Sequence, residues 1–230
     1  MLYANTNNGE KQEPYPKGYG FCPYCHNIMI AKCGEIKIWH WAHKPGTKCD
    51  IFSKPESDWH IAWKKKFPKE NVKVIIIKND EKHIADAYLP KSKTAIEFQN
   101  SSITARDIRR RTEFYDHLIW IFNVKDAYEE DRLYAESENN YVWEHPKTTI
   151  RKIYWKSKVF LDTGYELWHI KYIYTRGYND FGGADWDLDI DEYEYNEFIE
   201  KLKPNMEWQV NLNLLQSKKS SLQVEQLELF

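Results

Sequence analysis

The chain has 230 residues, 42% of them hydrophobic, with 33 Lys and Arg against 35 Asp and Glu. This length suits one large domain or a core with small appendages, and the apolar content excludes a chain that is disordered throughout. The N-terminus lacks a basic flank followed by an apolar run, and the longest aliphatic stretch, Val74 to Ile77, is too short to span a bilayer. We therefore expect a cytoplasmic protein that does not enter membranes.

The charge is unevenly distributed. The first 125 residues hold 21 Lys and Arg against 14 Asp and Glu, whereas the remainder holds 12 against 21. A basic half suits a polyanionic partner such as DNA, although an ordinary solvated surface has the same composition.

Residues 1–18 are predicted to be a flexible N-terminus, and residues 19–52 a small zinc-finger-like module of two β-hairpins. Cys22 and Cys25 have the spacing of a zinc knuckle. The second pair of ligands should be His43 and Cys49, with His40 as the alternative to His43, because an extended strand points these two histidines to opposite faces. Four protein ligands would make the zinc structural; otherwise these are unrelated buried cysteines and surface histidines.

The central part, residues 53–125, has the pattern of a compact core. A helix is expected from about residue 55 to 67 with Ser53 as its N-cap, followed by the strand-like segments NVKVIIIK, HIADAYL and TAIEFQ. Thr104 then begins a second helix that ends near Asp116, and LIWIFNV is typical of a buried strand. The order α-β-β-β-α-β predicts an α/β sheet that contains a parallel pair of strands. Residues 126–214 show no clean periodicity and are expected to form a mixed C-terminal extension.

Two carboxylates interrupt the apolar strands of this core. Asp86 lies in the second strand and Glu97 in the third. A carboxylate in a buried strand is costly unless it is paired or binds a metal, so we expect the two to converge and to bind Mg²⁺ or Mn²⁺. Because clustered carboxylates repel each other, removing either one should leave the fold intact and its stability equal or higher.

A family resemblance supports this interpretation. ADAYL followed by AIEFQNSSI resembles the acidic core of the PD-(D/E)XK nuclease superfamily, and the series FCPYC, HWAHK, PESDWH, IEFQNS and LIWIF resembles the competence protein CoiA family. The resemblance implies a restriction-endonuclease-like fold, with Asp86 and Glu97 as metal ligands and Glu56 as an auxiliary carboxylate. Gln99 occupies the position where most superfamily nucleases have Lys, and this removes a positive charge that would stabilise the transition-state phosphate.

Other residues near the expected site have two interpretations each. Glu56 could instead close a capping box with Ser53, and His60, one turn later, could face the cleft or only pack. Ser101 could hold Gln99 or a phosphate, or merely turn the chain. A basic ridge on the second helix could neutralise a DNA backbone or be a solvated face; it consists of Arg106, Arg109, Arg110 and Arg111, the last of which we place closest to the site together with Tyr115.

The C-terminal third contains two further motifs. DWDLDIDEYEY resembles a calcium loop only superficially, because Ile190 stands where Gly is required, so we expect a solvent-facing acidic strand. Residues 215–230 are expected to be a flexible tail whose end, QLELF, resembles the pentapeptide that binds the bacterial β sliding clamp, through Gln226, Leu227, Leu229 and Phe230. The same apolar residues could instead pack onto the domain.

The sequence thus predicts a metal-dependent nuclease that acts on DNA in competence, recombination or repair. The alternative is a DNA-binding recombination mediator that keeps the fold without the chemistry. A nuclease of mobile-element or defence origin would share the mechanism.

Overall fold

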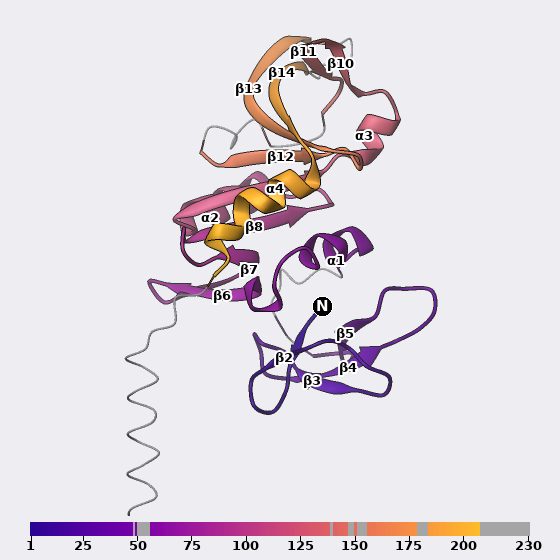
Figure 1. Cartoon of the computed structure of the whole chain (residues 1–230), viewed down its shortest axis with the longest axis vertical. Helices are drawn as coiled ribbons and strands as arrows, with labels where there is room; N and C mark the ends of the chain where they lie inside the picture. The colour runs from indigo at the N-terminus through magenta and orange to yellow at the C-terminus, as the bar shows by residue number, and fades with distance from the viewer. Residues whose placement is uncertain are drawn as a thin grey trace, which may run out of the picture.

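A computed structural model describes residues 1–47, 49, 56–138, 140–146, 150, 156–178 and 184–207. The chain forms two sheets, with helix α1 (Asp58–Lys64) between the small N-terminal sheet and the large one (Figure 1). No helix in these residues is long and apolar enough to cross a membrane.

The N-terminal sheet begins at the start of the chain, which corrects the expected flexible segment 1–18. Leu2 is 2% exposed and the backbone N–H of Trp41 donates to the carbonyl of Met1, so this segment packs as part of the sheet. The five antiparallel strands lie in the order β2-β1-β3-β4-β5; they are β1 (Ala4–Asn5), β2 (Lys11–Gln12), β3 (Tyr19–Phe21), β4 (Ile28–Lys32) and β5 (His40–His43).

Helix α1 begins later than expected. Its N-cap is Ser57, whose hydroxyl accepts the backbone N–H of His60, whereas the predicted cap Ser53 lies outside the described residues. Ile61 and Trp63 are the apolar residues that α1 buries. Glu56 therefore precedes the N-cap and does not occupy the third helical position that a capping box requires.

The three predicted strands and the second helix are present. They are β6 (Val72–Lys78), β7 (Glu81–Leu89) and β8 (Thr94–Gln99), then α2 (Ala105–Phe114) with Thr104 as N-cap, and β9 (His117–Asn123). Strands β6, β7 and β8 are antiparallel neighbours, and β9 is parallel to β8, as the strand–helix–strand order predicts. Apart from one 3-10 turn, Lys69–Asn71, the observed order from α1 to β9 is α-β-β-β-α-β.

The C-terminal third continues the same sheet. Strand β12 (Lys158–Asp162) pairs in parallel with β9, and the complete order is β10-β11-β14-β13-β12-β9-β8-β7-β6. The remaining elements are α3 (Lys125–Glu129), β10 (Leu133–Ser137), β11 (Asn140–Trp143), β13 (Leu167–Tyr178), β14 (Ala184–Tyr193), α4 (Tyr195–Leu202) and the 3-10 turn Lys203–Asn205. The expected extension is thus half of a nine-stranded sheet.

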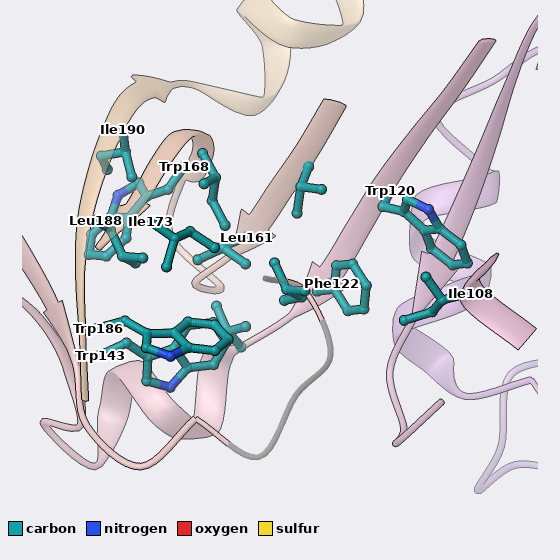
Figure 2. Packing of buried hydrophobic residues seen from close by; sticks show 14 of the residues in the cluster. Ile108, Trp120, Phe122, Trp143, Leu161, Trp168, Ile173, Trp186, Leu188 and Ile190 are labelled. Carbon is teal, nitrogen blue, oxygen red and sulfur yellow. The ribbon is translucent and has the colours of Figure 1, made fainter. Parts of the chain in front are cut away.

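One apolar cluster joins the two halves of this sheet. It runs from Ile108 and Trp120 beside α2 through Leu161 to Trp143 and Trp186 (Figure 2). A second cluster on α1 and α4 contains Trp63 and Phe198. Removing residues after 125 would therefore expose one side of a continuous core.

The acidic segment of β14 is a strand, as expected. Trp186, Leu188 and Ile190 point into the core, and the alternating aspartates lie on the opposite, partly exposed face. Asp189 and Asp191 both lie near Lys171 on β13, at 3.1 and 3.0 Å from its Nζ. These carboxylates balance cross-strand cations.

Candidate functional site

The predicted zinc ligands converge in the N-terminal sheet. Cys22 and Cys25 lie in the turn between β3 and β4, His43 ends β5 and Cys49 follows, and their ligand atoms all lie within 4.8 Å of one another. His40, the alternative, instead places Nδ1 2.9 Å from the carbonyl of Ile38. The cluster has the ligand chemistry of a zinc site.

The pKa values of the two knuckle thiols are shifted in opposite directions. Burial raises the pKa of Cys22. Burial would also raise the pKa of Cys25, but hydrogen bonds from Asn27, Cys49 and His43 lower it to about 6. The Nε2 atom of His43 lies 3.3 Å from the Cys25 sulfur, and the backbone N–H of Tyr24 donates to Cys22. A thiolate beside an imidazole is the form that binds a metal.

A row of charged side chains crosses three strands of the large sheet. Val72 pairs with Ala87 and Val74 with Ala85, so the register places Lys73 of β6 opposite Asp86 of β7. Ala87 pairs with Ile96, which places Asp86 opposite Glu97 of β8. Asp86 and Glu97 thus occupy opposite positions on neighbouring antiparallel strands, at the point where the β7–β8 pairing stops.

Asp86 is held as an anion by two lysines. Its Oδ1 lies 2.8 Å from Lys73 Nζ and 3.0 Å from Lys64 Nζ, and its Oδ2 accepts the backbone N–H of Phe98. Burial alone would raise the pKa of Asp86, but the two ammonium groups hold it well below its ordinary value. Lys73 has a φ of 52°, a left-handed conformation that is strained for a residue with a Cβ.

Glu56 belongs to the same ion cluster. Its Oε1 lies 2.6 Å from Lys64 Nζ and 3.0 Å from Lys73 Nζ. Burial would raise the pKa of Glu56, but Lys73 and Lys64 lower it. The lysines thus bridge Glu56 and Asp86, and among the described residues the three carboxylates do not form a set of mutually close ligand atoms like the Cys/His cluster.

Glu97 has different neighbours. Its side chain is 2% exposed, Tyr115 of the α2 C-cap donates its hydroxyl to Oε1 at 3.0 Å, and Arg111 donates to Oε2. Burial raises the pKa of Glu97, and the nearby Asp86 charge raises it further while Arg111 lowers it. Arg111 and Tyr115 are therefore the residues of α2 and its C-cap that contact Glu97.

Gln99 and Ser101 lie farther along the chain and interact with each other. The Gln99 amide donates to the Ser101 carbonyl, and in the described part of the chain it makes no hydrogen bond to Asp86 or Glu97. His60 packs between the Ser57 hydroxyl, at 2.8 Å, and the Phe98 carbonyl, at 3.1 Å. These two contacts connect the start of α1 to β8.

The predicted arginine ridge divides into two parts. Arg111 turns inward to Glu97, whereas Arg106, Arg109 and Arg110 are exposed. Arg110 donates two hydrogen bonds to Glu81, at 2.8 and 2.6 Å. The exposed part is the basic surface that could meet a polyanion.

Lys64 and Lys73 were not predicted from the sequence. Lys73 interrupts the apolar run of β6 as Asp86 interrupts β7, which is a usable signal for pairing. Lys64 stands in the series WKKKF, where nothing distinguishes it from its exposed neighbours, yet it is completely buried.

Comparison with known proteins identifies the family. Residues 7–52 match the model of the competence protein CoiA N-terminal domain, and residues 70–174 match that of the competence protein CoiA nuclease-like domain. No curated protein and no solved structure matches the chain. The first match contains the Cys/His cluster, and the second contains Asp86, Glu97 and the strands β6 to β12. The two matches together cover about two thirds of the sequence, so the chain belongs to the competence protein CoiA family.

Proposed function

We propose that the protein is a metal-dependent nuclease that acts on DNA in competence, recombination or repair, with a restriction-endonuclease-like core. The observation that carries the proposal is the opposition of Asp86 and Glu97 on adjacent strands, inside the segment that matches the nuclease-like domain. Buried carboxylates in this arrangement have few roles other than ion pairing and metal binding.

The two carboxylates suit a hard divalent cation such as Mg²⁺ or Mn²⁺. Each bonded carboxylate oxygen keeps lone-pair capacity beyond the donors it already has, and the raised pKa of Glu97 reflects burial and the charge of Asp86, both of which a bound cation would offset. When bound, the metal would polarise the phosphodiester and lower the pKa of the attacking water. Asp86 and Glu97 would hold it, with Glu56 as the auxiliary carboxylate.

Lys64 and Lys73 supply positive charge that Gln99 cannot. In this family member the superfamily lysine position is Gln99, but two ammonium groups reach Asp86 from α1 and β6. We assign to Lys73, whose side chain is 17% exposed, the neutralisation of the scissile phosphate, which gains charge in the transition state, and to the buried Lys64 the positioning of Asp86. Arg106 and Arg109 would contact the backbone beyond the scissile group.

The second candidate is a DNA-binding recombination mediator without cleavage activity. The same ion pairs favour it, because Asp86 and Glu56 are already neutralised by Lys64 and Lys73 without any metal. Cleavage assays with and without a divalent metal separate the two functions. Activity that requires the metal and Glu97 supports the nuclease; DNA binding without cleavage supports the mediator.

Two further parts of the proposal concern the ends of the chain. The Cys/His cluster would hold a structural zinc ion, since four protein ligands leave no open position. The QLELF motif lies outside the described residues. We propose that Gln226, Leu227, Leu229 and Phe230 bind the bacterial β sliding clamp, because the motif matches throughout and follows a polar segment.

A further inference from the structure

A large pocket lies at the amino ends of the parallel strands β8, β9 and β12. Its volume is about 940 Å³, and its wall includes Thr94, His117 and Lys158, the first residues of these three strands. Helices α2 and α4 contribute residues from their C-terminal parts, among them Thr112 and Lys201. The volume falls in the range of small-molecule sites, about 300–1,000 Å³.

The wall of the pocket is predominantly basic. Lys158 has no acidic partner in the part of the chain that the structure describes, whereas Lys171 is near Asp189 and Asp191. Asp116 is the one acidic residue among the lining side chains, and its carboxylate lies 2.8 Å from Lys78. The lining cations are Lys156, Lys158, Lys171 and Lys201, of which Lys201 also lies 2.7 Å from the carboxylate of Glu197. Such a wall favours an anionic ligand.

Aromatic rings lie beside these cations. Tyr172 on β13 lines the pocket and is 56% exposed. Tyr193 lies under Lys201, whose Nζ is 4.3 Å from the ring centroid, and Phe160 stacks on His169 at 4.7 Å. Of these rings, only that of Tyr172 is exposed. An exposed aromatic ring beside cations is a feature by which proteins hold a nucleotide, with the phosphate at one end and the base at the other.

Two hydroxyl groups in the wall lack partners. The Ser157 side chain belongs to a residue only 8% exposed, and its Oγ is buried without a hydrogen bond in the described structure. The Oγ1 of Thr112, across the pocket on α2, is in the same state. A buried polar atom without a partner costs free energy, so it requires an explanation such as a ligand that pairs with it.

The pocket is separate from the row of charged side chains that crosses β6, β7 and β8. Asp86, Glu97 and Glu56 do not line it, and it shares only Tyr115 with that site. The register places Thr94 opposite His117 at the pocket end of the sheet, and Gln99 opposite Phe122 at the far end. The pocket therefore lies outside the carboxylates of the proposed nuclease centre.

We propose that this pocket binds a nucleoside monophosphate, either free or as the end of a DNA strand. Lys158 and Lys156 contact the phosphate, the hydroxyls of Ser157 and Thr112 rotate toward the pocket and donate to its oxygens or to the sugar, and the base lies against Tyr172. The proposal does not depend on cleavage activity, because none of the carboxylates proposed to hold the catalytic metal takes part.

The test uses the full-length chain in buffer with EDTA, so that metal-dependent cleavage plays no part. Calorimetric titrations compare thymidine monophosphate, thymidine and a 5′-phosphorylated oligothymidylate. The variants are Tyr172→Ala and Lys158→Glu. Their matched controls are Tyr174→Ala, a tyrosine on the same strand that is 57% exposed and does not line the pocket, and Lys37→Glu on the N-terminal module.

We expect thymidine monophosphate to bind the parent and both controls, with at least fivefold weaker binding to Tyr172→Ala and at least tenfold weaker binding to Lys158→Glu. Thymidine should bind at least tenfold more weakly than its monophosphate. A tighter, Tyr172-dependent interaction with the oligonucleotide identifies a strand end as the source, and a preference for the monophosphate identifies the free nucleotide. Binding that is absent, or that is equal in the variants and their controls, overturns the proposal. Circular dichroism confirms that each variant is folded.

Discussion

Replacing Asp86 by Asn tests how the charged row is stabilised. Asn keeps the shape of the side chain and the hydrogen bond from the Phe98 N–H, but removes the charge that faces Lys64 and Lys73. Lys64 is 0% exposed, so it cannot recover its solvation. The structure thus predicts destabilisation, opposite in sign to the carboxylate repulsion expected from the sequence.

The magnitude follows from the remaining contacts. Removing one partner of a buried ion pair costs about 3–5 kcal/mol. Glu56 still lies 2.6 Å from Lys64 and 3.0 Å from Lys73, so we expect a value near the lower end, about 3 kcal/mol. For a chain of this size that corresponds to a melting temperature about 6–12 °C lower.

The assay is urea denaturation of the parent, Asp86→Asn, and the double variant Asp86→Asn/Lys73→Met. In the double variant one carboxylate, Glu56, again faces one lysine, Lys64. It should recover at least half of the unfolding free energy that Asp86→Asn loses. Asp131→Asn, at an exposed position, is the control and should change stability by less than about 0.5 kcal/mol. If Asp86→Asn is as stable as the parent or more so, the ion cluster does not stabilise the fold and our interpretation is wrong.

The other predictions concern pH, zinc, catalysis and the tail. The pKa of Asp86 is lowered in the folded protein, so the ionised carboxylate contributes fully to the free energy of unfolding above about pH 3.9. This contribution is lost as the pH falls through the folded pKa, so the difference in unfolding free energy between the parent and Asp86→Asn should narrow below about pH 4. A difference that stays constant would contradict this. The purified protein should contain about one zinc per chain by elemental analysis, and Cys22→Ser should lose it. Glu97→Gln should reduce DNA cleavage at least about 100-fold while the far-ultraviolet circular dichroism stays unchanged. Deleting residues 226–230 should abolish sliding-clamp binding, with a parent dissociation constant on the order of micromolar, and leave cleavage and melting unchanged; a lower melting temperature would show that the tail packs on the domain.

The features predicted from sequence are those that depend on local spacing. The Cys22 and Cys25 knuckle needs only a tight turn. Thr104 caps α2 because its hydroxyl accepts the backbone N–H of Asp107, the third residue of the helix. Asp86 and Glu97 are recognisable because each interrupts an apolar strand next to a short turn. The knuckle and the helix cap are predictable because their interacting residues are few positions apart. The two carboxylates are predictable because a charge in an apolar strand requires an ion partner or a metal.

The rest depends on long-range pairing. The selection of Lys64 over its neighbours follows from how α1 packs against β8, which the sequence of α1 does not specify. Strand β13 alternates poorly because its register with β14 shifts twice, between Ile170 and Tyr172 and between Thr175 and Gly177, so the period of two is interrupted. The parallel pairing of β12 with β9 then extends the sheet across 34 residues of intervening chain, residues 124–157.

The central claim is metal-dependent cleavage at Asp86 and Glu97. The most direct test incubates the purified protein with single-stranded and double-stranded DNA, with Mg²⁺, with Mn²⁺ or with EDTA, beside Glu97→Gln and the control Asp131→Asn. We predict that the parent and the control cut DNA only when a divalent metal is present, and that Glu97→Gln does not cut. If the folded parent binds DNA but never cuts it with either metal, the nuclease proposal is contradicted and the mediator function stands.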